Sequence, residues 1–249
     1  RSKAAALVRA EYIKAREYGE KKVKAAADSA DAPPMNLGYE ALLDAMSGKK
    51  VVHHHTHRSD DILTVLRLAE EFGFRVVLHH VSDAWKVADE IAAAGIPVSL
   101  ISVDSPGGKL EAKDNNFKSG RVLEEAGVLV GFHTDDGISD SRFFLRQAAL
   151  AVRAGMSREK ALFGMTLAGA EMIDLGDRVG SLTPGKDADF IILTGDPLSV
   201  YTHVQETWID GQRVFDRSNA QDRMYATGGY GASNEQVMHL HLLEEEAGQ

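Results

Sequence analysis

Apolar, strand-like segments and amphipathic, helix-like segments alternate four times between residues 51 and 154, and this alternation restricts the fold more than any other feature of the chain. The strands are predicted at residues 51–55, 74–80, 97–102 and 128–133, and the helices that follow them at 60–72, 84–94, 117–126 and 141–154. Apolar strands that alternate with amphipathic helices are typical of a parallel sheet covered by helices. The sequence therefore predicts an α/β fold with four consecutive βα units.

The segments on either side of this array have a different character. Residues 3–27 are rich in alanine and predict a long surface helix, and a short helix is expected at 38–47. After about residue 180, turn-forming residues lead into an apolar strand at 190–193 and then a hairpin around Asp210-Gly211, with Trp208 and Val214 on its arms. We expect a βα domain over residues 1–178, and a small β unit with an extended C-terminal tail over 179–249.

Composition excludes several classes of protein. The 249 residues include no cysteine, so disulfides and thiolate metal sites are ruled out, and the 28 basic and 37 acidic side chains give a net charge of −9. A net negative charge argues against a broad basic surface for nucleic acid. No apolar stretch is long enough to cross a bilayer, and no signal peptide is recognisable. We expect a soluble protein of the cytoplasm, the periplasm or the exterior that acts on a small molecule, with no nucleic-acid or membrane partner.

Seven of the ten histidines lie at the C-terminal ends of predicted strands, and they fall into three groups: His53, His54, His55 and His57; His79 and His80; and His133. Active sites of βα barrels lie at the C-terminal ends of the strands, and imidazole is a common zinc ligand. Asp135 follows His133 by two residues and adds a carboxylate on the same face, suited to metal binding or proton transfer. The same aspartate would also suit a cap for the helix at 141. Three such groups in register predict a functional site.

The residues around these histidines resemble the second half of the amidohydrolase superfamily, in its imidazolonepropionase-like branch. The resemblance rests on HTHRSDDI at 55–62, LHH at 78–80, TD at 134–135 and VGSLTPGKDADF at 179–190, and it extends from about residue 1 to about 230. The βα pattern alone also permits an open doubly wound sheet. The resemblance implies instead the C-terminal half of a (β/α)8 TIM barrel, strands five to eight, plus part of a small β-sandwich.

The resemblance also implies roles for individual residues. His55, His80 and Asp135 would bind one or two divalent metal ions, expected to be zinc. Asp135 and His80 would be catalytic, with Asp135 taking the proton from the attacking water. Contacts with substrate are expected from four further residues: His57, Arg58, His79 and His133.

The family pattern requires barrel strands one to four, with a His-x-His pair on the first, and no such pair precedes residue 51. The sequence also begins with Arg1. We therefore expect the N-terminal half of the barrel to be a separate chain or a lost segment, and the protein to be an oligomer. The expected activity is metal-dependent hydrolysis of C–N bonds in amides or cyclic amides. Deamination on the same scaffold and a non-catalytic fragment or assembly subunit are the alternatives.

Overall fold

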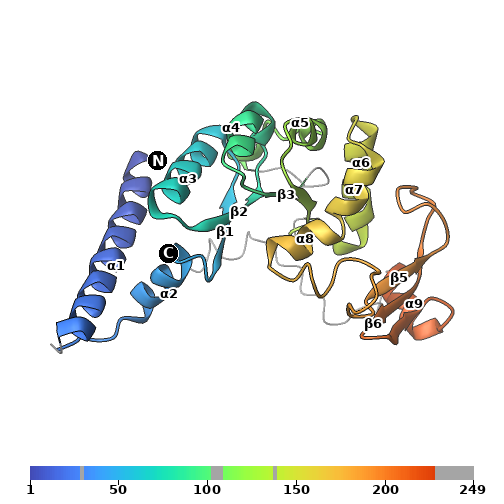
Figure 1. Ribbon diagram of the computed structural model, residues 1–249. Helices are drawn as coiled ribbons and strands as arrows, with labels where there is room; N and C mark the ends of the chain where they lie inside the picture. The colour runs from blue at the N-terminus through green and yellow to red at the C-terminus, as the bar shows by residue number, and fades with distance from the viewer. Residues whose placement is uncertain (29–30, 102–108, 137–138, 228–249) are drawn as a thin grey trace, which may run out of the picture.

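The computed structural model describes residues 1–28, 31–101, 109–136 and 139–227, which together form an arch (Figure 1). The middle of the arch is a four-stranded sheet of β1 (Val51–Thr56), β2 (Arg75–His80), β3 (Val98–Leu100) and β4 (Val130–Phe132). All neighbouring strands are parallel, and their order in the sheet follows the sequence. The predicted parallel sheet of consecutive βα units is confirmed.

Helical segments follow each strand of this sheet: α3 (Ser59–Phe72); η1 (Ala84–Lys86) and α4 (Ala88–Ala93); η2 (Leu110–Ala112) and α5 (Ser119–Glu125); η3 (Ser141–Phe143) and α6 (Phe144–Arg153). In α3, the buried residues Ile62, Val65 and Ala69 recur every three or four positions and therefore share one helix face. The prediction of one continuous helix at 84–94 is wrong. Val87 has a non-helical φ of −135° and separates η1 from α4.

The two faces of the sheet carry different residues, because side chains alternate along a strand. Leu78 points into the core between sheet and helices, where it is fully buried with Ile62 and Ile91. Val77 and His79 occupy the opposite face, which lines the concave side of the arch. The polar half of this inner face lies toward the C-terminal ends of the strands.

Two helices that the sequence did not reveal, α7 (Arg158–Gly164) and α8 (Leu167–Met172), follow α6. From α8, Met172 packs with Val77 in an apolar cluster and covers the inner face where Gly131 has no side chain. The lower part of the inner face is therefore apolar and covered. The part toward the strand ends carries histidines instead.

At the N-terminal side of the arch, α1 (Ser2–Asp28) and α2 (Leu37–Met46) extend away from the sheet (Figure 1). Tyr12 of α1 stacks on Phe72 and Phe74, with ring centroids 5.0 and 5.1 Å apart, and so attaches α1 to the βα array. A cavity of about 940 Å³ lies between α1, α3 and β1, lined by residues that include Val8, Val52 and His54.

The other side of the arch is a separate antiparallel sheet of β5 (Phe190–Leu193), β6 (Val204–Ile209) and β7 (Gln212–Asp216). Asp210 and Gly211 form the two-residue turn between β6 and β7, and both have positive φ values, 50° and 71°. Phe190 stacks on Trp208 with centroids 5.6 Å apart. The predicted hairpin and its separation from the first sheet are confirmed.

The sequence analysis predicted an extended C-terminal tail, and this prediction is wrong for the part that forms a helix. A helix, α9 (Ala220–Thr227), follows β7, and the side chain of Asn219 accepts a hydrogen bond from the backbone N–H of Gln221 at its start. Asparagine is a favourable residue at this position because its oxygen satisfies a free N–H. Residues 228–249 of the predicted tail lie outside the described residues. Within the described residues, no helix combines the length and the apolarity that a membrane span requires.

Candidate metal centre

The polar side chains of the inner face lie in one row across the sheet. The strand register aligns His55 of β1 with His79 of β2, and His79 with Ser99 of β3. His133 follows β4, and its backbone N–H donates to the carbonyl of Leu100. Because the strands are parallel, their C-terminal ends meet at the same edge, and the three histidine groups of the sequence converge there.

Three imidazoles at this edge are in mutual contact. The ring centroids lie 4.3 Å apart for His55 and His80, 4.9 Å for His55 and His57, and 5.2 Å for His57 and His80. In a regular strand, His80 would point to the face opposite His79. His80 and Val81 instead have φ values of 69° and 43°, a left-handed conformation that is costly for such residues and is concentrated at functional sites. This turn at the end of β2 brings the His80 ring to His55.

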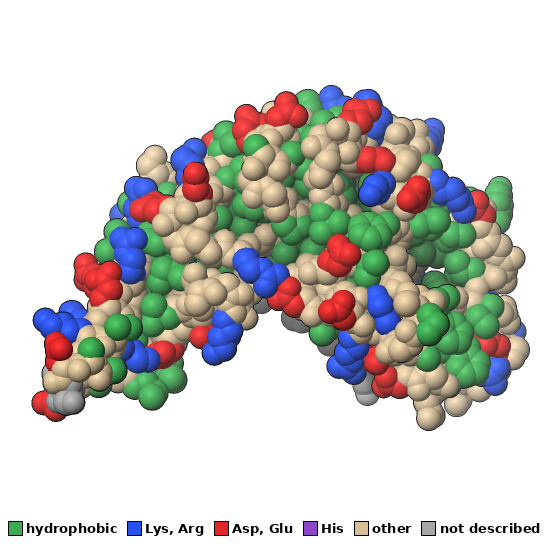
Figure 2. All heavy atoms as spheres, in the orientation of Figure 1, with side chains coloured by type: hydrophobic (Ala, Val, Ile, Leu, Met, Phe, Trp, Pro, Cys, Tyr) green, Lys and Arg blue, Asp and Glu red, His purple; other side chains and the backbone are tan. Residues whose placement is uncertain are grey.

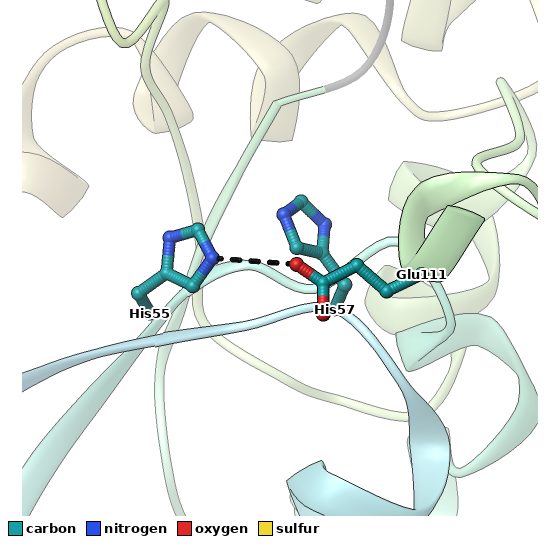
Figure 3. A group of neighbouring side chains, drawn as sticks. All are labelled: His55, His57 and Glu111. Atoms are coloured by element: carbon teal, nitrogen blue, oxygen red, sulfur yellow. Dashed lines mark ion pairs between the residues drawn. The ribbon is translucent and has the colours of Figure 1, made fainter. Parts of the chain in front are cut away.

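Glu111 approaches the same group from the segment after β3 (Figure 3). Its Oε1 lies 4.0 Å from His55 Nε2, and ligand atoms of His55, His57 and Glu111 all lie within 4.8 Å of one another. The sequence analysis did not identify Glu111, because no local pattern marks it. Two neighbours of that segment, Gly107 and Gly108, lie outside the described residues.

Long-range contacts hold the segment that carries Glu111. Trp85 of η1 donates its Nε1–H to the backbone carbonyl of Asp114 at 3.1 Å, and Lys86 Nζ lies 2.6 Å from the Asp114 carboxylate. The ammonium of Lys118 lies 3.8 Å from the centroid of the Trp85 ring, within the range of a cation–π interaction. The βα unit of β2 therefore positions an acidic residue of the next unit.

His57 is oriented like a metal ligand. Its Nδ1 lies 2.8 Å from Ser82 Oγ, while its Nε2 is buried and has no hydrogen-bond partner among the described residues. The residue is only 7% exposed. Leaving a buried polar atom unpaired costs about 1–3 kcal/mol. Histidines that bind metals have their second ring nitrogen fixed by a hydrogen bond, so this geometry fits an ion at Nε2.

Burial makes the histidines of the site poor bases. It lowers the pKa of His80 to about 3 and that of His133 to about 4, with the neighbouring imidazoles acting in the same direction. Burial also lowers the pKa of His55 and His57. At neutral pH these rings are neutral, which is the protonation state that binds a divalent metal.

Asp135 follows the end of β4 and is near enough to the histidines for its charge to act on them, but the group whose ligand atoms lie within 4.8 Å of one another is His55, His57 and Glu111, without Asp135 or His80. Asp135 is exposed, and its φ is 52°. Burial lowers the pKa of His55 and His133, and the negative charge of Asp135 partly opposes this lowering. The alternative role, capping the next helical segment, belongs to its neighbours. Asp136 accepts from the N–H of Ser141, and Asp140 accepts from that of Arg142.

The remaining predicted substrate contacts have partners within the protein. Arg58 forms an ion pair with Asp60, with Nε and Oδ1 3.0 Å apart. His79 Nε2 lies 2.8 Å from Nδ1 of His53, a histidine to which the sequence analysis gave no role. The site therefore contains a second imidazole pair, on the inner face below the contacting three.

Comparison with known proteins agrees with this architecture. A profile of the Amidohydrolase family matches residues 8–214, and the chain belongs to that family. A solved structure, the amidohydrolase from Thermotoga maritima MSB8, superposes with a TM-score of 0.81 at 35% sequence identity, covering 86% of this chain and 56% of that one. The described sheet is thus part of an amidohydrolase TIM-barrel fold.

Curated relatives have several activities. Amidohydrolase tasK of Hapsidospora irregularis is 29% identical over 187 residues, which is 74% of this chain and 19% of that protein. Adenine deaminase 2 of Shouchella clausii is 38% identical over 35% of this chain and 15% of its own length. Imidazolonepropionase of Thermoplasma volcanium is 29% identical over 43% of this chain and 28% of its own length. The chain spans less than a third of the length of each of these curated relatives.

Proposed function

We propose that this chain supplies strands five to eight of the barrel, and part of the β-sandwich, of a metal-dependent hydrolase that cleaves C–N bonds in amides or cyclic amides. The observation that carries the proposal is the group of neutral imidazoles, with centroids 4.3–5.2 Å apart, at the C-terminal edge of a parallel sheet in a member of the amidohydrolase family. Neutral imidazoles beside carboxylates are the donor set that zinc prefers.

The metal would be held by His55 and His80 together with Asp135. His57 and Glu111, whose ligand atoms lie within 4.8 Å of one another and of His55, offer two further donors for it or for a second ion. A divalent ion held there would lower the pKa of a bound water molecule and polarise the carbonyl oxygen of the substrate. The hydrogen bond between Ser82 and Nδ1 of His57 orients the His57 ring so that its Nε2 can bind an ion.

Asp135 is the group that would move the proton. Its carboxylate accepts a proton from the water whose oxygen attacks the carbonyl carbon, and returns it to the nitrogen as the C–N bond breaks. The products are a carboxylate and a protonated amine, which together carry both protons of the water. The exposure of Asp135 supports this role, because an exposed carboxylate is accessible to water and to a substrate.

The other strands of the barrel would come from an N-terminal half. Among the described residues, β1 and β4 are the edges of the sheet, and the cavity between α1 and β1 lies along one of them. This chain covers 56% of the Thermotoga amidohydrolase, whose remaining length is sufficient for such a half.

A deaminase is the second candidate, favoured by the similarity to adenine deaminase 2 of Shouchella clausii. The same water attack would then release ammonia from an aminated ring. Ammonia release from aminopurines therefore separates this reaction from the ring opening of cyclic amides.

Two measurements test the proposal. The first is the metal content of the chain after purification without chelator, and the second is turnover in the presence of a polypeptide that carries strands one to four. We expect stoichiometric metal that is lost in His80→Ala and retained in His203→Ala, because His203 is an exposed histidine immediately before β6, away from the site. We expect Asp135→Asn to keep the fold and reduce turnover at least 100-fold, since general acid–base catalysis contributes about 10²–10⁴. A complete barrel without bound metal would instead identify a non-catalytic subunit.

A further inference from the structure

A chain of hydrogen bonds connects His80 to the interior of the sheet. Ser99 Oγ lies 2.8 Å from His133 Nδ1, and His133 Nε2 lies 3.0 Å from His80 Nδ1. The chain joins β3, the end of β4 and the end of β2. Ser99 and His80 are buried, at 7% and 8% exposure, and His133 is half-buried.

Both nitrogens of His133 are engaged, so the protons of the two rings are coupled. A neutral imidazole has one N–H donor and one acceptor nitrogen. If His133 donates from Nε2 to His80, then Nδ1 of His80 is an acceptor and its Nε2 carries the proton, which prevents ligation through Nε2. If His80 donates from Nδ1, then His133 accepts at Nε2 and donates from Nδ1 to Ser99, and His80 Nε2 has a free lone pair.

We propose that His133, supported by Ser99, is a positioning residue that accepts the Nδ1–H of His80 and so presents the lone pair of His80 Nε2 to the divalent metal. The inference rests on the proposed function, in which His80 is a metal ligand. Ser99 matters because its hydroxyl oxygen is the acceptor that lets His133 carry its own proton on Nδ1. The bond also holds the His80 ring in the orientation that the left-handed backbone of that residue creates.

His57 and His80 share one arrangement, in which a neighbouring side chain holds the Nδ1 atom of the ring by a hydrogen bond. Ser82 holds Nδ1 of His57, whose buried Nε2 has no hydrogen-bond partner among the described residues, and His133 holds Nδ1 of His80 in the same way. Hydrogen bonds to the second nitrogen fix the tautomer and the ring orientation of a metal-binding histidine, and removing them costs about 10- to 100-fold in metal affinity or activity.

Zinc affinity, measured by competition with a chromogenic chelator, tests the inference without any assay of turnover. His133→Phe keeps a planar ring and removes both nitrogens, and we expect it to raise the zinc Kd by about 10- to 100-fold. Ser99→Ala should raise the Kd by a smaller factor, and Ser99→Thr, which keeps the hydroxyl, should restore it. His203→Phe is the matched control and should leave the Kd unchanged.

The ¹⁵N spectrum of zinc-loaded protein gives a readout that a purely structural role would not move. We expect a protonated Nδ1 and a ligated Nε2 for His80 in the wild type and in Ser99→Thr, and a loss of the protected Nδ1–H signal in His133→Phe. If His80→Ala loses zinc while His133→Phe and Ser99→Ala bind it with wild-type Kd, the inference is wrong and the proposed function stands. If the wild type binds no zinc, both are overturned.

Discussion

At the scale of single residues, the site combines burial with a high density of histidine. Folding brings imidazoles from three βα units together and removes part of the water around them, most completely at His57 and His80, which disfavours their charged forms. The pKa of His80 falls to about 3 and that of His133 to about 4, from 6.5 for a free histidine. The same desolvation that prepares these rings to bind a cation makes the folded state sensitive to acid.

We therefore predict that the metal-free protein loses stability as the pH falls below about 6.5. Below this value the unfolded chain binds protons on His80 and His133 that the folded protein excludes until about pH 4 or lower. The stability that these histidines contribute is present above pH 6.5 and lost as the pH falls, by up to about 1.4 kcal/mol per pH unit for each. Urea unfolding at pH 7 and pH 5, with chelator present, measures it.

Two variants isolate the contribution of the buried histidines from that of the carboxylates. His133→Phe should show a smaller difference in unfolding free energy between the two pH values than the wild type, and His203→Phe should show the wild-type difference. Equal pH dependence in all three proteins would contradict the prediction.

At the scale of elements, the sequence predicted what repeats locally and missed what depends on distant contacts. The strands were predictable as short apolar runs between turn-like segments, and α3 because its apolar residues recur with the helical period. The histidine cluster was predictable because parallel strands bring their ends together. Glu111 was not, since Trp85 and Lys86 of another βα unit hold its segment in place. The break at the buried residue Val87 is likewise not marked by a helix-terminating residue in the sequence.

The short helix α7 shows how one residue can decide the packing of an element against the sheet. A Cβ atom at Gly164 would lie 2.8 Å from the carbonyl oxygen of Val130 and 2.9 Å from the Phe132 ring. We predict that Gly164→Ala lowers the free energy of unfolding by about 1–3 kcal/mol, because α7 must move away from β4.

Gly169 in α8 provides the matched control, since nothing lies within 4 Å of the position of its Cβ. Gly169→Ala should raise the free energy of unfolding by about 0.5–1 kcal/mol, because alanine favours the helix more than glycine does. Urea titrations of both variants test the pair. A change of the same sign in the two proteins would show that close packing at Gly164 is not the cause.

At the scale of the whole molecule, the arch has an open concave side (Figure 2). The sheet ends at β1, and beside this edge the cavity of about 940 Å³ is lined by Ala5, Val8 and Val52 as well as by His55 and Glu111 of the candidate site. Unpaired backbone groups at the edge of a sheet are a template for a further strand. Our proposal that an N-terminal half completes the barrel therefore places a strand of that half against β1 and beside α1.

We predict that the chain self-associates when alone and forms a defined complex with a polypeptide that carries strands one to four, as light scattering would show. Val8→Glu introduces a charge into the cavity from α1, and we expect it to weaken the complex at least tenfold, or about 1.4 kcal/mol. Val23→Glu is the control, because Val23 lies on the same helix, is 72% exposed and does not line the cavity. The prediction is wrong if the chain is a cooperatively folded monomer that does not bind the polypeptide. If both substitutions weaken the complex equally, the barrel does not close at this edge of β1.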